Sequence, residues 1–317
     1  MVEQVKNLEK LKETFGNVAQ EVSKTIVGQQ EVIEHILVAI LTGSNALLES
    51  PPGLGKTTLI KSLAQVLDLD FSRIQNTPDL MPSDITGTYV IEEHEGKKTF
   101  IFQKGPLFAN IVLADEINRA TPKTQAALLE AMQEKQVTVG TETFYLEEPF
   151  FVLATQNPID NEGVYPLPEA QVDRFLLKIV VPYPTAEEEL EIVNRFTTAA
   201  EITPVNKLLG ENSIKLLQKL TRQVPIADDI KQRAVKLVQQ TRNTPERIEY
   251  GASPRASIGL ILAAKAHALI QGRKFVSSKD VDAMALPVLR HRIIASFSAE
   301  REGKTTDDLI KELLDKL

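Results

Sequence analysis

A short apolar segment, a loop with two glycines and a helical pattern follow one another between residues 45 and 67, and this order constrains the fold most. The segment reads NALLESPPGLGKTTLIKSLAQVL. Gly53 and Gly55 allow the loop to turn its backbone N–H groups inward around an anion. The N-terminus of the following helix adds a partial positive charge. The segment therefore predicts a buried strand, a phosphate-binding loop and a helix.

Individual residues of this loop carry the predicted chemistry. Lys56 is expected to reach the terminal phosphates of a nucleotide, and the Thr57 hydroxyl to bind Mg²⁺. The usual loop begins with a glycine, where this chain has Ser50. Because that glycine only starts the turn, we expect a small serine to replace it; the alternative is an ordinary helix start. The loop residues predicted to bind nucleotide are Pro52, Gly53, Leu54, Gly55, Lys56, Thr57 and Thr58.

A second motif is the apolar run IVLADE, which ends in Asp115 and Glu116. It predicts a buried strand that delivers two carboxylates to solvent. Asp115 is expected to bind Mg²⁺, through water, and Glu116 to polarise the water that attacks the γ-phosphate. The alternative is a strand end with two solvated acids. A phosphate loop and this strand in the observed order favour a nucleotide-hydrolysing site.

Three further polar residues are candidates for the same chemistry. Asn157 follows the buried run FFVLATQ and could position the attacking water, or it could be a turn residue before proline. Arg174 and Arg255 could supply the guanidinium that phosphoryl transfer requires. The alternative for Arg174 is an ion pair with Asp173 or Glu169, and the alternative for Arg255 is a solvated helix start.

The order of elements predicts an α/β fold in two parts. Strand and helix patterns alternate up to residue 184, which predicts a three-layer αβα domain with a mostly parallel sheet. From residue 185 to residue 317 the periodicity is almost wholly helical, so we expect a second, all-helical domain. Helices are expected at about 186–200, 213–223, 227–243, 254–271, 278–290 and 306–317.

Composition excludes several classes of protein. The chain has no Cys, which rules out disulfides and thiolate sites. It has no Trp, 5% aromatic residues and a net charge of −7, which disfavours a nucleic-acid-binding protein. The four histidines lack metal-ligand spacing. No apolar signal core or membrane span is evident, so we expect a soluble cytoplasmic protein.

The motifs, taken in order, resemble those of the MoxR family of AAA+ ATPases. The similarity covers most of residues 25–295 and includes the spacers between the nucleotide motifs. The matching stretches are VGQQEVIEHILVAIL, LLESPPGLGKTTLIKSLA, NTPDLMPSDITGTYV, QKGPLFANIVLADEINRATPKTQAALLEAMQEKQVTV, PFFVLATQNPIDNEGVYPLPEAQVDRFLLKIVVPYPT and YGASPRASIGLILAAKAHAL. This family often lacks the first loop glycine, so Ser50 does not argue against a working site.

The resemblance implies roles that the residues alone do not. Gly28 and Gln29 correspond to the segment that packs against adenine. An insert is implied at about 77–105 and a hairpin at about 136–146. Asn157 corresponds to sensor 1, Arg174 to an arginine finger that acts on the neighbour's ATP, and Arg255 to sensor 2. The finger implies a ring, typically a hexamer, that remodels or matures partner proteins, often partners with a von Willebrand factor A domain.

Two other functions remain open at this stage. One is a scaffold that binds ATP in order to assemble and hydrolyses little. The other is a DNA-translocating motor, which the acidic net charge and the low aromatic content disfavour. An enhancer-binding transcription activator is also disfavoured, because its GAFTGA loop motif is absent from the sequence.

Overall fold

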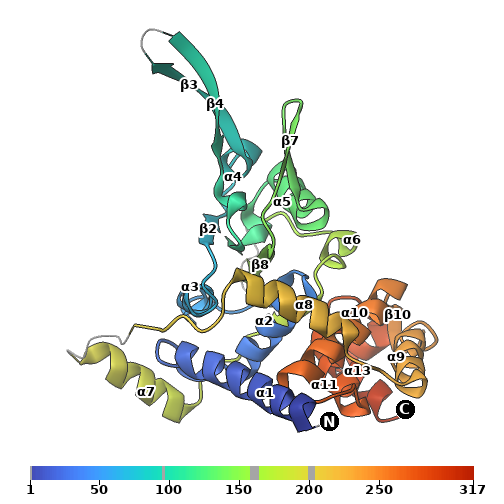
Figure 1. The fold of residues 1–317 in the computed structure, drawn as a ribbon. Coiled ribbons are helices and arrows are strands. Elements are labelled where there is room, and N and C mark those ends of the chain that lie inside the picture. Colours follow the sequence, from blue (N-terminus) through green and yellow to red (C-terminus); the bar gives the residue numbers. More distant parts are fainter. Residues whose placement is uncertain (1, 95–96, 158–163, 199–203) are drawn as a thin grey trace.

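The computed structural model describes residues 2–94, 97–157, 164–198 and 204–317 (Figure 1). Its centre is a five-stranded sheet in the order β2-β5-β8-β1-β9, and every pair of neighbouring strands in it is parallel. The strands are β1 (Ala46–Glu49), β2 (Phe71–Gln75), β5 (Ile111–Asp115), β8 (Phe151–Gln156) and β9 (Leu177–Val180). The expected parallel sheet is confirmed. The carboxyl ends of all five strands therefore meet at one edge, where open α/β sheets bind ligands.

Both faces of the sheet are covered, which explains the continuous apolar runs in its strands. In β5 all five residues are buried. Their side chains alternate between two hydrophobic cores: Leu113 belongs to one core and Val112 and Ala114 to the other. Helix α3 (Lys56–Val66) and helix α5 (Pro122–Glu134) contribute to opposite cores, so the domain has the expected three layers.

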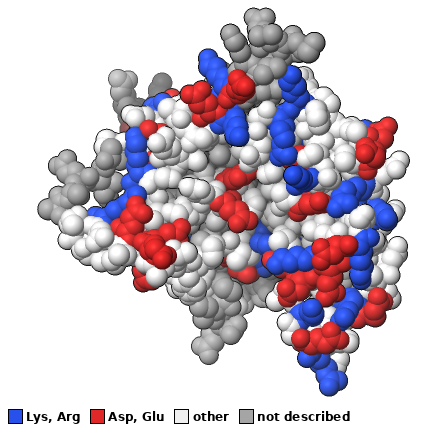
Figure 2. All heavy atoms as spheres, turned by 90° about the horizontal axis from the view of Figure 1, so that it is seen from below, with Lys and Arg blue, Asp and Glu red and all other residues white. Residues whose placement is uncertain are grey.

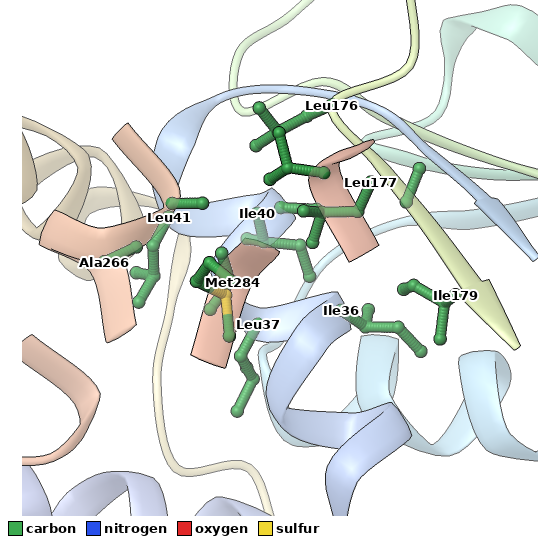
Figure 3. Packing of buried hydrophobic residues seen from close by; sticks show 14 of the residues in the cluster. Ile36, Leu37, Ile40, Leu41, Leu176, Leu177, Ile179, Ala266 and Met284 are labelled. Carbon is green, nitrogen blue, oxygen red and sulfur yellow. The ribbon is translucent and has the colours of Figure 1, made fainter. Parts of the chain in front are cut away.

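Helix α2 (Gln30–Thr42) joins the sheet to the helical part of the chain. Ten of its residues are buried, from Val32 to Thr42 with Glu34 the exception, as expected for a helix that is covered all round. Figure 3 shows the packing: side chains of α2 lie between those of the β9 region and those of two later helices. The labelled residues are Ile36, Leu37, Ile40, Leu41, Leu176, Leu177, Ile179, Ala266 and Met284.

The helical region contains helices α8 to α13 and a small sheet. The helices are α8 (Glu211–Gln223), α9 (Asp228–Gln240), α10 (Pro254–Ile270), α11 (Ser278–Leu289), α12 (Phe297–Arg301) and α13 (Thr306–Leu314). Two short antiparallel strands, β10 (Ile248–Tyr250) and β11 (Ile294–Ala295), also pair here. The expectation of a wholly helical region was wrong on this point, because strands of two or three residues are too short to show an alternating pattern.

Helix α7 (Ala186–Thr197) lies apart from the other helices that follow the sheet (Figure 1). It lies instead beside helix α1 (Val2–Val22) and the segment after it, where Arg195 Nη1 donates to the backbone oxygen of Ser23 at 2.8 Å. We expected one helical domain from residue 185 onward. The structure separates α7 from α8 by a long connection, and the last expected residues of this helix, 199 and 200, lie outside the described residues.

Two hairpins project from the sheet domain on one side (Figure 1). The longer one pairs β3 (Gly87–His94) with β4 (Lys97–Lys104), after the short helix α4 (Pro82–Thr86), and the turn expected at 95–98 lies partly outside the described residues. The shorter one pairs β6 (Gln136–Val139) with β7 (Glu142–Tyr145). The rings of Phe102 and Phe144 stack at 4.1 Å, and Tyr89 donates a hydrogen bond of 2.6 Å to Glu142, so the two hairpins support each other.

Candidate functional site: a phosphate cavity and a separate arginine cluster

The loop between β1 and α3 has the backbone conformation that its sequence requires. Gly53 and Gly55 have φ values of +83° and +73°, a region that side chains with a Cβ rarely adopt. The Lys56 ammonium donates to the backbone oxygen of Ser50 at 3.2 Å. Ser50 itself is fully buried, and its hydroxyl donates to the backbone oxygen of Pro51 at 2.9 Å. The serine is therefore part of the turn that the missing glycine usually starts.

The predicted phosphate-binding residues line one cavity of about 350 Å³ at the carboxyl edge of the sheet, called the phosphate cavity from here on. Asp115, Glu116 and Asn157 contribute one wall, as the sequence predicts, and the loop contributes the other. Arg73, from β2, also lines the cavity and was not predicted from sequence. The described residues that line it are Pro52, Gly53, Leu54, Gly55, Lys56, Thr57, Thr58, Arg73, Asp115, Glu116 and Asn157.

The two carboxylates at the end of β5 are held in different ways. Asp115 is 7% exposed and accepts hydrogen bonds of 2.7 Å from the Thr155 hydroxyl and from Arg73. Glu116 has a φ of +55°, which is uncommon for a residue with a side chain. Its backbone N–H donates to the same Thr155 hydroxyl at 2.9 Å. Thr155 therefore holds the carboxylate of Asp115 and the backbone of Glu116. The positive φ of Glu116 turns the chain away from the direction of β5.

The Glu116 carboxylate has two further neighbours. Arg119 Nε lies 3.4 Å from it, and Gln75 Nε2 donates to it at 3.2 Å. Because its partners are partly exposed side chains rather than buried ones, this carboxylate can exchange them for a ligand. It therefore meets the geometric requirement for a group that accepts a proton from an attacking water.

The donor atoms present fit a magnesium ion. Mg²⁺ prefers oxygen ligands, typically one or two from the protein with phosphate and water completing the shell. The Thr57 hydroxyl and the Asp115 carboxylate are both on the wall of the phosphate cavity. These two residues would hold the ion, as the sequence predicts.

A second cavity, of about 640 Å³, adjoins the loop on the side of α7. The loop glycines Gly53 and Gly55 line both cavities, so a nucleotide could extend from one to the other. Gln29 lines this cavity and donates to the backbone oxygen of Leu54 at 3.0 Å. Gly28 has a φ of +67°, and a Cβ there would lie 2.2 Å from a carboxylate oxygen of Glu188. Glycine is favoured here because of this positive φ, and a larger residue would also require the Glu188 side chain to move.

This second cavity, called the base cavity from here on, has both polar and apolar walls. Apolar side chains from the segment before α2 and from α7 face it, which suits a purine ring. They are Ile26, Val27, Ile192 and Phe196. Helix α7 therefore lines this cavity together with the loop, away from α8 to α13.

Arg174 and Arg255 are not among the described residues that line the phosphate cavity. They belong to a second cluster, centred on Asp173. Arg255 Nη1 lies 3.5 Å from Asp173 Oδ2, and the Ser253 hydroxyl donates to the same oxygen at 3.1 Å. Arg255 is thus a half-exposed ion-pair partner rather than a simple solvated helix start. Within the described residues, Arg174 forms no ion pair with Asp173 or Glu169, which was the alternative considered from sequence.

Arg292 anchors this cluster, and sequence reasoning missed it. Its side chain is 2% exposed, and its Nε donates to Asp173 Oδ1 at 2.7 Å. It also donates to the backbone oxygens of Asp173 at 3.2 Å and Leu176 at 2.9 Å. A saturated, buried guanidinium of this kind fixes the backbone on both sides of Arg174. No short motif could reveal it, because its partners in the sheet domain lie 116–119 residues away in the sequence.

Comparison with known proteins gives consistent results. Residues 45–177 match the model of the ATPase family associated with various cellular activities (AAA), and residues 239–313 match that of the AAA lid domain. Chaperone MoxR1 of Mycobacterium tuberculosis is 43% identical over 93% of this chain and 79% of its own length. The chain belongs to the MoxR family of AAA+ ATPases. Like other AAA ATPases it is an ATP-hydrolysing enzyme, with a mostly parallel sheet followed by a helical lid.

Other relatives of this MoxR-family chain agree in length and fold. YeaC of Bacillus subtilis, whose name records no function, is 41% identical over 96% of this chain and 95% of its own. The crystal structure of a Cytophaga hutchinsonii protein assigned as an ATPase superimposes with a TM-score of 0.91 and 42% identity, covering 98% of this chain and 96% of that one. None of the described helices is both long and apolar enough to cross a membrane.

Proposed function

We propose that this protein hydrolyses ATP to ADP and phosphate in a ring, and that it uses hydrolysis to remodel or mature partner proteins. The observation that carries the proposal is the division of the site. The loop, the two acids and Asn157 converge on one cavity, whereas Arg174 and Arg255 lie outside it. Because neither Arg174 nor Arg255 lines the cavity of its own chain, we propose that an adjacent chain supplies the arginine finger.

Each residue of the cavity has a role in the proposed reaction. The loop N–H groups bind the phosphates, and Lys56 exchanges the backbone oxygen of Ser50 for a terminal phosphate oxygen. Mg²⁺, when bound, neutralises charge that develops on the phosphates. Glu116 orients the attacking water and accepts its proton, and Asn157 positions that water or contacts the γ-phosphate.

Arg174 and Arg255 are proposed to act together on the nucleotide of the adjacent subunit. From sequence, Arg255 was expected to sense the γ-phosphate from the lid. Its ion pair with Asp173 ties it to the residue next to Arg174 in the sequence, and we propose that both guanidiniums face one surface. We propose a heterologous ring contact, with a hexamer as the typical closure, in which this surface meets the neighbour's phosphate cavity.

The coupling to partner proteins is proposed from family membership and from the hairpins. A relative is named a chaperone, which supports a chaperone-like role here. The two projecting hairpins are suited to contact a client, and a protein with a von Willebrand factor A domain is the proposed partner. We place this activity in the cytoplasm. On the face seen in Figure 2, Lys and Arg side chains are interspersed with Asp and Glu, so that face does not favour a DNA motor.

Steady-state phosphate release in the presence of Mg²⁺, combined with sedimentation velocity, tests the proposal. We expect turnover by the wild-type protein, and ring assembly when ATP is added to the Glu116→Gln variant, which should bind ATP without cleaving it. Binding and assembly without phosphate release would support the scaffold alternative. Absence of ATP and ADP binding at millimolar concentrations would refute both.

A further inference from the structure

Arg73 connects both acids of the phosphate cavity. It lies on β2, next to β5 in the sheet. One of its terminal nitrogens, Nη2, donates to Asp115 Oδ2 at 2.7 Å and also to the side-chain oxygen of Gln75. Gln75 in turn donates to Glu116 at 3.2 Å. A single guanidinium thus reaches the predicted metal ligand directly and the predicted water-polarising residue through one amide.

Asp115 already has a cationic partner, Arg73. Thr155 donates to Oδ1 and Arg73 donates to Oδ2, so each carboxylate oxygen already has a partner. Asp115 is almost completely buried, and a buried carboxylate without a compensating charge is costly. Arg73 supplies that charge from a side chain that is 44% exposed and therefore has room to move. A divalent ion approaching Asp115 meets a positive charge and is repelled by it.

We propose that Arg73 is the built-in counter-cation of this site: it holds Asp115 until magnesium nucleotide arrives, then releases the carboxylate and places its charge on the phosphates. This inference rests on the proposed function of the cavity. It assigns Arg73 two opposite effects. Arg73 competes with the metal for Asp115, and it partly replaces the metal as a partner of the nucleotide.

These opposite effects separate the proposal from a purely structural role. In the Arg73→Met variant, a divalent ion should bind the ADP complex about 3- to 10-fold more tightly, because one competing charge is gone. The same variant should bind ATP about 3- to 10-fold more weakly in EDTA, because no cation replaces the metal. A variant that is merely loosened would lose affinity in both measurements.

The experiment uses the full-length protein and Mn²⁺ as the probe. Electron paramagnetic resonance of free Mn²⁺ gives its affinity for the ADP complex, and calorimetry gives ATP affinity with Mg²⁺ and with EDTA. Arg233→Met is the matched control, since Arg233 pairs with Asp282 in the lid, and it should change neither value. Should Arg73→Met not fold, Arg73→Lys tests the same point, because lysine keeps the positive charge but lacks the planar guanidinium; its shifts should have the same signs and be smaller.

The outcomes are distinguishable. Tighter Mn²⁺ binding together with weaker metal-free ATP binding supports the counter-cation role. Unchanged or weaker Mn²⁺ binding in a folded variant overturns it, while the proposed hydrolysis stands if the wild-type protein releases phosphate. If the wild-type protein binds neither ATP nor ADP, the proposed function fails first.

Discussion

The phosphate cavity and the Asp173 cluster contain the same kinds of side chain in opposite arrangements. In the cavity, cationic and acidic groups line a space of about 350 Å³ that can receive a ligand. In the cluster, Arg255 and Arg292 close around one carboxylate, next to Arg174, which has no ion-pair partner among the described residues. The cavity can receive a triphosphate, whereas the cluster can present a guanidinium to one. We propose that the two regions are two halves of one site, a receiving half that binds the nucleotide and a donating half that supplies the guanidinium, and that the halves meet only between subunits.

The two regions also differ in what holds them. The cavity residues stand at strand ends and on a loop, which fix them within the sheet domain. The cluster depends on contacts between the sheet domain and the lid, because Ser253, Arg255 and Arg292 all come from the lid and all reach Asp173. The position of Arg174 is thus set by the lid.

The largest expected effect separates the two halves by function. Arg174→Ala should lower turnover about 10³-fold, because a finger that neutralises transition-state charge contributes on this scale. ATP affinity, measured by calorimetry, should change little, since Arg174 does not line the phosphate cavity. Arg222→Ala, a change of an exposed arginine on α8, is the control. A large loss of ATP affinity in Arg174→Ala would place the residue in its own subunit's site.

The next largest effect is expected at Glu116, in the phosphate cavity. Glu116→Gln should lower turnover about 10²-fold or more, because an amide cannot accept the proton of the attacking water. Bound ATP should persist, and filter binding with labelled ATP measures its lifetime. Hydrolysis at the wild-type rate would show that Glu116 is not the polarising residue.

A smaller effect is expected at Arg292, which holds the segment that contains Arg174. Arg292→Met should lower turnover about 10-fold by letting the Arg174 segment shift, without changing ATP affinity. Asp173→Asn should act on the same contact, so the double variant should lose less than the two single losses combined. A double-mutant cycle on turnover checks this. Fully additive losses would mean that the two residues act independently.

The smallest effect lies away from both halves, where the lid meets α2. Burial lowers the pKa of His267, but hydrogen bonds from the His267 ring to Asp280 and Glu34 outweigh it and raise the pKa to about 9. The protonated ring therefore stabilises the fold fully below pH 6.5, and this contribution is lost as pH rises through 9. Between pH 6.5 and pH 9, the free energy of unfolding of the wild type should therefore fall by about 1–2 kcal/mol more than that of His267→Gln.

Chemical denaturation at several pH values measures this difference. The comparison between wild type and variant is needed because Lys135, whose pKa burial lowers to about 8, titrates in the same range. Parallel pH profiles for the two proteins would contradict the role assigned to His267. Asp280→Asn should reduce the same pH dependence, since it removes one of the two acidic partners of the ring and leaves Glu34.

The receiving half could be predicted from the sequence, because its residues lie within short motifs that end consecutive strands. Gly53, Lys56, Asp115 and Asn157 each follow or precede an apolar run, and a parallel sheet brings such ends together. The expected sheet and its strands are confirmed for the same reason. Strand periodicity and loop chemistry are local signals, which a single sequence contains.

The features that the sequence did not predict depend on contacts between distant segments. Arg73 meets Asp115 across 42 residues and Arg292 meets Asp173 across 119, so neither has a local signal. The position of α7 was also missed, since a helical pattern does not say what the helix covers. The β10–β11 pair was missed because its strands are too short. The roles of Arg174 and Arg255 remain predictions.

The most direct test of the divided site mixes two inactive variants. Lys56→Ala subunits cannot hold ATP but carry Arg174, and Arg174→Ala subunits hold ATP but lack the finger. In rings mixed one to one, about a quarter of the wild-type turnover per subunit should return, because half of the subunits bind ATP and half of those meet an intact finger. Mixing Lys56→Ala with the Lys56→Ala/Arg174→Ala double variant should restore nothing. If the first mixture also releases no phosphate although mixed rings form, the two halves do not meet between subunits and the account is wrong.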